Sequence, residues 1–142
     1  MPGHLRMHSS KKILSRLLVI TLISTLVACG SLQEKREQSF YDTLTLFKHA
    51  LRRESPESQL AFFINPESAN LPSRYGMRAV EMDQLTPPVE IEENIWVIKV
   101  RLQYLKESSQ SIRTIDDRQQ WHWLGEDDGW RRNNPMPIVL RR

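Results

Sequence analysis

The chain has 142 residues with four Trp, four Phe and three Tyr, enough length and aromatic content for one domain with one hydrophobic core. Its single cysteine excludes an intramolecular disulfide. The net charge of +3 arises in residues 1–28, which hold four Lys or Arg and no acid; residues 29–142 hold 16 basic and 17 acidic residues, a net charge of −1. Without a basic excess in that part, we expect no nucleic-acid partner.

The N-terminal segment has the order of parts of an export signal. A basic start is followed by an apolar run over residues 17–27, and Ala28 and Gly30 flank Cys29. The run is shorter than the roughly 20 apolar residues of a membrane-spanning helix. The sequence Leu26–Gly30 resembles the lipobox at the end of a bacterial lipoprotein signal peptide. The translation start is either Met1 or Met7.

The lipoprotein resemblance implies how the chain is processed and where it lies. Residues 1–28 would be the signal peptide, cut between Ala28 and Cys29, and Cys29 would carry diacylglyceryl and palmitate groups. The chain would then be attached to a membrane through the lipid on Cys29, with another envelope protein as a candidate partner. In enterobacterial lipoproteins an Asp after the cysteine favours the inner membrane, so Gly30 favours the periplasmic face of the outer membrane.

Two helices are expected after a short polar tether over residues 29–37. In the segment Gln38–Arg53, apolar residues recur at spacings of four, three and four, the period of an amphipathic helix; these are Phe40, Leu44, Phe47 and Leu51. Ser55-Pro56 has the pattern of a helix start, with Ser as N-cap and Pro in the first turn. This second helix is predicted to end at Asn65-Pro66, and residues 67–73 are predicted as a loop.

Four strands are predicted in the rest of the chain, because the apolar period changes from helical to two. They are Tyr75–Leu85, Ile95–Leu105, Ser111–Leu124 and Trp130–Asn133. Alternation in Ile95–Leu105 predicts one buried and one solvated face, which is typical of an antiparallel sheet. The glycines of residues 125–129 indicate a hairpin turn. We expect a bulge at Asp116-Asp117.

Helices followed by a strand meander predict an α+β fold, with N-terminal helices packed on a curved antiparallel sheet of about four strands. The order of elements and the segment from Gln120-Trp121-His122-Trp123 to Gly129-Trp130-Arg131 resemble the NTF2-like (SnoaL-like) superfamily of cone-shaped domains. The resemblance covers about residues 38–134 of a single domain spanning residues 38–142. A cystatin-like arrangement, with one helix across a sheet, is the alternative.

The NTF2-like resemblance implies candidates for catalysis, because isomerases and dehydratases of that superfamily place an Asp or His inside the cone as general base. The candidates are His122, Asp116, Asp117 and Asp83. His122 alternates with two tryptophans and is expected on the opposite face from them. Asp116 and Asp117 adjoin, so they should point to opposite faces of a strand and serve structural roles rather than act as a catalytic pair. We therefore assign no catalytic residue.

The tryptophans remain as candidates for a pocket or a partner surface, with packing in the core as the alternative; they are Trp96, Trp121, Trp123 and Trp130. The polar side chains expected on one sheet face form either a basic patch or a solvated surface: Lys99, Arg101, Gln103, Arg113 and Arg118. No spacing of His and Cys predicts a metal site, and no Gly-rich phosphate loop is present. We predict neither metal nor cofactor.

Three functions follow from these features. The first is a non-enzymatic envelope lipoprotein whose domain acts as a binding or assembly module. The second is an enzyme of isomerase or hydrolase type that uses a buried Asp or His. The third is a structural lipoprotein without a ligand pocket. The contents of the domain interior distinguish the first two: a buried acid or histidine beside a cavity favours the enzyme, and a filled interior favours the module.

Overall fold

The computed structural model describes the backbone of residues 10–53 and 55–137, and the side chains of residues 30, 32–52, 55–74 and 76–137. The chain divides into two compact units, Met1–Gln38 and Ser39–Arg142. The predicted cleavage and lipidation residues, Ala28 and Cys29, lie outside the residues whose side chains are described, as does the whole predicted signal peptide.

The first helix, α1 (Ser10–Arg53), begins well before the predicted start at Gln38 and includes residues 30–37, which we expected as a short polar tether. This segment contains no proline, and its Gln, Glu, Lys and Arg residues have high helix propensity. Arg36 Nη2 donates a hydrogen bond of 2.9 Å to Gln33 Oε1 one turn earlier. Eight residues in a helix advance about 12 Å, whereas the same eight fully extended would span about 26–29 Å.

The second helix is much shorter than predicted. α2 (Pro56–Leu60) has the expected start, with the Ser55 side chain accepting a hydrogen bond from the Ser58 amide. It ends before Phe63, because residues 62–64 form backbone hydrogen bonds with Arg132 instead: Arg132 N to Phe62 O at 2.7 Å and Ile64 N to Arg132 O at 2.9 Å. Two short 3₁₀ helices, η1 (Pro66–Ser68) and η2 (Pro72–Tyr75), occupy most of the predicted loop.

An antiparallel sheet of five strands follows, in the order β1-β3-β4-β5, with β2 also paired to β3. The strands are β1 (Met77–Gln84), β2 (Val89–Glu92), β3 (Ile95–Lys106), β4 (Ser111–Trp123) and β5 (Trp130–Arg132). Four of them match the predicted strands, and β2 was missed because Pro87-Pro88 resembles a terminator. Since β4 pairs with β3 along its whole length, β1 and β2 lie in succession on the other side of β3.

The pairing of β3 with β4 runs without interruption from Ile95↔His122 to Lys106↔Ser111, so the bulge expected at Asp116-Asp117 is absent. Register shifts occur instead between Ala79 and Glu81 and between Glu90 and Glu92, both on the β1–β2 side. The predicted hairpin over residues 125–129 is confirmed, with positive φ at Gly125 and Gly129.

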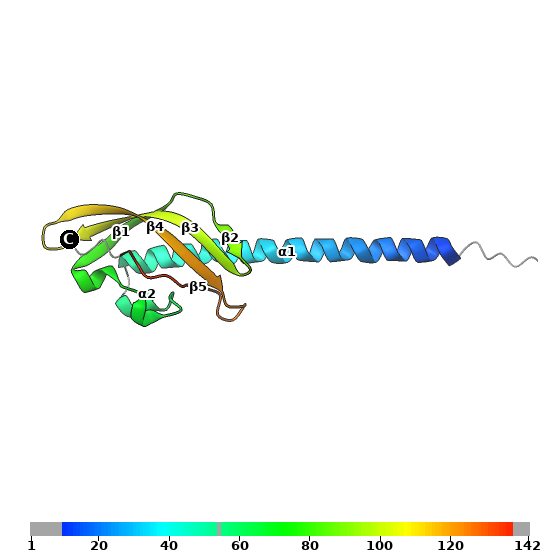
Figure 1. Ribbon diagram of the computed structural model, residues 1–142, viewed down its shortest axis with the longest axis horizontal. Helices are drawn as coiled ribbons and strands as arrows, with labels where there is room; N and C mark the ends of the chain where they lie inside the picture. Colours follow the sequence, from blue (N-terminus) through cyan, green and yellow to red (C-terminus); the bar gives the residue numbers. More distant parts are fainter. Residues whose placement is uncertain (1–9, 54, 138–142) are drawn as a thin grey trace, which may run out of the picture. The chain divides into compact units, whose positions relative to one another are not determined.

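The sheet is strongly curled into a half-barrel around the part of α1 that follows Ser39 (Figure 1). The predicted apolar stripe of α1 is buried against the sheet. The predicted inward residues of β3, from Trp96 to Tyr104, are also buried. The α+β class and the helix-on-sheet packing are therefore confirmed.

Candidate functional site

The interior of the curled sheet is filled by aromatic side chains. Phe40 of α1 packs against Trp96 and Trp130, with ring centroids 5.1 and 5.0 Å apart, and Trp96 lies 4.7 Å from Trp130. Phe47 packs edge-on against Trp121 at 5.4 Å. Three of the four tryptophans are buried, and Trp123 is half-buried against Trp130 at 5.4 Å. Trp96, Trp121 and Trp130 are thus core residues rather than an exposed partner surface.

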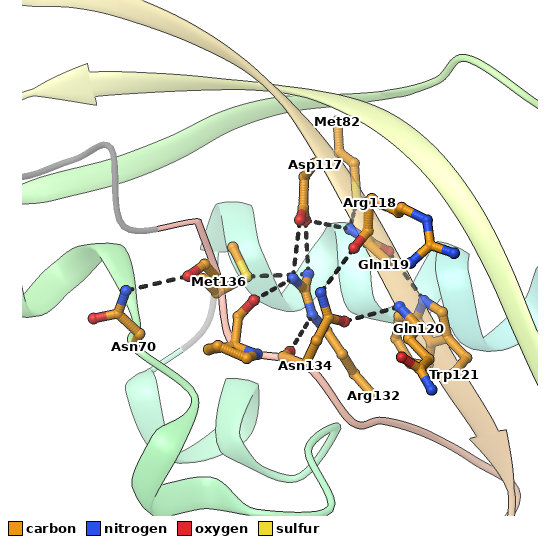
Figure 2. Close-up of polar contacts among 11 residues, drawn as sticks. Asn70, Met82, Asp117, Arg118, Gln119, Gln120, Trp121, Arg132, Asn134 and Met136 are labelled. Carbon is orange, nitrogen blue, oxygen red and sulfur yellow. Dashed lines mark hydrogen bonds and ion pairs between the residues drawn. The ribbon is translucent and has the colours of Figure 1, made fainter.

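A buried ion pair lies beside this aromatic cluster, between Asp117 of β4 and Arg132 of β5 (Figure 2). The guanidinium binds the carboxylate with two parallel hydrogen bonds, Nη1 to Oδ2 at 2.8 Å and Nη2 to Oδ1 at 3.1 Å. The Arg132 side chain is fully buried and that of Asp117 is 4% exposed. An ion pair of this bidentate kind is strong and fixes the geometry of both side chains.

Arg132 uses its other N–H groups to hold the segment that follows β5. Nε donates to the carbonyl of Asn134 at 2.8 Å, Nη2 to the carbonyl of Pro135 at 2.7 Å, and Nη1 to Met136 Sδ at 3.3 Å. With the two bonds to Asp117, all five N–H donors of the guanidinium have acceptors. The cation also lies over the rings of Phe47 and Phe63. Arg132 therefore fixes the C-terminal segment to the sheet.

Gln119 extends the network along β4. Its Nε2 donates to Asp117 Oδ2 at 3.1 Å, and its Oε1 accepts a hydrogen bond from the Trp121 indole at 3.1 Å. Tyr104 is fully buried on the neighbouring strand, and its hydroxyl has no hydrogen-bond partner among the described residues. Burial, reinforced by the charge of Asp117, raises the pKa of Tyr104 far above its usual range.

The four candidates for general acid or base do not converge. Asp117 faces the interior, but Arg132 and Gln119 occupy both of its oxygens. Asp116 is exposed on the outer face, where it accepts hydrogen bonds from Arg101 at 2.9 and 3.4 Å and raises the pKa of that guanidinium. Asp83 of β1 is exposed and lies opposite Arg101 of β3. His122 is half-buried, and its Nε2 lies 3.3 Å from Gln120 Nε2. The adjacent aspartates do point to opposite faces, as predicted.

The polar residues considered as a basic patch are divided between the two faces of the sheet. Lys99 and Arg118 lie directly opposite each other on β3 and β4, and both are exposed on the outer face. Arg113 instead lies opposite the buried Tyr104. Because directly paired residues share a face, Arg113 belongs to the core side at the exposed end of the hairpin. A single patch containing Arg113 is therefore wrong.

Surface pockets follow the groove between α1 and the edge strand β1. Two of them, of about 220 and 190 Å³, share Arg52, Arg78 and Ala79 in their walls. A third, also of about 220 Å³, lies farther along the same pair of elements and includes Leu44 and Met82. The ion pair between Lys48 of α1 and Glu81 of β1, at 2.6 Å, joins the two elements between these pockets.

Sequence reasoning missed Arg132 as a network residue, although a signal was present. Trp130 and Arg132 are two residues apart, so both point to the core side of β5, and Asp117 has the matching parity on the adjacent strand. An inward arginine next to an inward aspartate predicts a buried pair. Arg52 and Arg78 carry no comparable signal, because their proximity depends on how α1 crosses β1.

Within the described residues, no cluster of three or more His, Cys, Asp or Glu side chains could hold a metal ion. No helix in the described part of the chain has both the length and the apolar character of a membrane span. Comparisons with protein-family models, with curated proteins and with solved structures give no match to the chain.

Proposed function

We propose that the chain is a bacterial envelope lipoprotein, attached through lipid on Cys29 to the periplasmic face of the outer membrane, whose α+β domain is a binding or assembly module. The basic start, the short apolar run and the lone cysteine between Ala28 and Gly30 support this location in the cell envelope. A second acyl chain makes such attachment stable, since one chain binds a membrane only marginally.

The observation that supports a module rather than an enzyme is that both carboxylate oxygens of Asp117 are hydrogen-bonded within the core. It is the buried carboxylate of the described residues, and its oxygens accept three hydrogen bonds from Arg132 and Gln119. A general base needs a free lone pair within reach of a substrate proton. Asp117 has neither a free oxygen nor a place in the walls of the α1–β1 pockets.

The fold relation that we propose is to the NTF2-like cone. The order of helix and meander, and the strong curl of the sheet around the helix, support it. The departure is α2, which has five residues where that arrangement has a full second helix. One long helix across the sheet is also the feature of the cystatin-like alternative.

The anchor is tested by labelling cells with radioactive palmitate. The wild-type chain should take up label and appear at the mass of the processed form, whereas Cys29→Ser should remain an unlabelled precursor. Ser31→Ala, two residues away, is the matched control and should behave as wild type. Normal processing and labelling of Cys29→Ser would refute the lipoprotein assignment.

The module is tested by purifying the full chain from detergent-solubilised membranes after mild cross-linking. A partner that copurifies in a fixed ratio, and that is lost when variants of the α1–β1 groove are used, supports a binding or assembly role. A chain that elutes alone and protects no groove residue from modification supports the structural lipoprotein instead.

A further inference from the structure

Arg52 and Arg78 stand apart from the other interior-facing or groove-lining cations of the domain. Lys48 is paired with Glu81, and Arg132 with Asp117. Among the residues that the structure describes, the guanidinium groups of Arg52 and Arg78 form neither a hydrogen bond nor an ion pair. Arg52 has only a longer-range charge interaction with Glu81. Two arginines whose guanidinium groups have no partner among the described residues therefore line the same two adjoining pockets.

Apolar side chains also line the larger pocket and are its floor. Leu51, Met77 and Ala79 line the larger pocket and are each at most 4% exposed. Pro56 and Pro72 add apolar walls from α2 and η2. A ligand that placed a few carbon atoms on this floor would gain burial free energy, while its charged end stayed with the arginines at the rim.

The charge of the wall limits the ligand further. Among the described residues that line the larger pocket, one carboxylate, that of Glu107, stands beside the two arginines, and these three groups carry a net charge of +1. A net positive charge favours an anionic ligand over a neutral one or a cation. The planar fork of a guanidinium also fits a carboxylate with two parallel hydrogen bonds.

We propose that the pocket between α1, α2 and β1 binds a small organic monocarboxylate, with its carboxylate held by Arg52 and Arg78 and its apolar body on Leu51, Met77 and Ala79. This inference rests on the proposed binding function and names the ligand class of the groove. The pocket of about 220 Å³ has room for a body of a few carbon atoms rather than a long acyl chain.

The test is an NMR titration of the full chain in a non-ionic detergent, which follows the backbone amides of Met77 and Ala79. Butyrate is the probe, and butanamide is its neutral isostere. Because hydrogen bonds to charged groups contribute more than neutral ones, we expect saturable butyrate binding that is at least about tenfold tighter than butanamide binding. Added salt should weaken butyrate binding and leave butanamide binding unchanged.

Arginine variants make the test specific. Arg52→Gln and Arg78→Gln should each weaken butyrate binding at least about fivefold, and Arg118→Gln, an exposed arginine of β4 outside the pocket, should not. Equal binding of butyrate and butanamide, or tighter binding of inorganic phosphate than of butyrate, would overturn the carboxylate site. An Arg52→Gln variant that lowers Tm but binds butyrate normally would also overturn it, since Arg52 would then serve only the C-terminal end of α1.

The two proposals fail separately. If the groove does not bind butyrate but the chain still copurifies with an envelope partner, the carboxylate site is refuted and the binding module is not. If the chain binds butyrate through Arg52 and Arg78 but remains in the cytoplasm, the lipoprotein assignment is refuted and the carboxylate site is not.

Discussion

Adjacent aspartates in β4 offer a sharp test of the buried network. Asp117→Asn removes one charge and keeps the shape of the side chain, leaving the fully buried Arg132 without its counter-ion. Asp116→Asn makes the same chemical change one residue earlier, at a side chain that is 49% exposed and paired with Arg101. Both substitutions preserve β4, so a difference between them reports the environment of the carboxylate.

The expected magnitude follows from the hydrogen bonds of Asp117. In the Asp117→Asn variant the new side chain could accept hydrogen bonds through one oxygen only, and its NH₂ group would face the N–H groups of Arg132. Removing one partner of a buried ion pair costs about 3–5 kcal/mol, because the remaining charge stays desolvated. That is a large part of the roughly 5–15 kcal/mol by which a domain is stable. For Asp116→Asn we expect little change in the free energy of unfolding, since solvent replaces the partner of Arg101.

Urea unfolding at neutral pH, followed by the fluorescence of the buried tryptophans, measures both free energies. The double variant Asp117→Leu/Arg132→Met should recover much of the stability lost in Asp117→Asn, because it removes both charges together. The reasoning is refuted if Asp117→Asn destabilises the chain no more than Asp116→Asn does.

Further predictions concern three other residues. Tyr104→Phe removes a buried hydroxyl without a partner and should raise the free energy of unfolding by about 1 kcal/mol; an equal loss in urea unfolding would contradict this. Because the raised pKa of Tyr104 keeps its proton on in the folded state only, wild-type stability should fall above about pH 10 by up to about 1.4 kcal/mol per pH unit, and Tyr104→Phe should lack this component in a Tm series. The hydrogen bond from Lys48 lowers the pKa of Glu81, so its contribution to stability is present above the unfolded pKa and is lost as the pH falls through the folded pKa; Glu81→Gln should flatten the acid side of the Tm profile, and an unchanged profile would contradict the pairing. Gly30→Asp should move the chain from outer-membrane to inner-membrane fractions on a sucrose gradient, and unchanged fractionation would remove Gly30 as a sorting signal.

Periodicity was sufficient to predict most of the fold. The buried faces of α1 and β3 follow from apolar spacing alone, because burial against one partner surface selects that spacing. The length of the second helix was predicted wrongly because apolar spacing describes only local contacts. Phe63 and Ile64 continue the helical spacing of apolar residues in the sequence. Their backbone instead pairs with Arg132, a contact that depends on residues far away in the sequence. Local propensity cannot include such a competitor.

The candidate site was predictable only in part. Alternation along β4 correctly separated Asp116 from Asp117, but it could not show which of them meets the buried Arg132. That depends on the register of β5, which is set by the hairpin at Gly125 and Gly129. The groove depends on how α1 crosses β1. The spacing of apolar residues within either segment does not determine that crossing.

The pairing of residues 62–64 with β5 has a consequence for self-association. This segment covers the outer side of β5, where a second copy could otherwise pair. Because β5 pairs only with Trp121–Trp123, the earlier part of β4 and the outer sides of β1 and β2 are the stretches of the sheet with which no described strand pairs. Edge-to-edge association of this domain would therefore have to use one of these two stretches, and the end of the sheet at β5 would take no part in it.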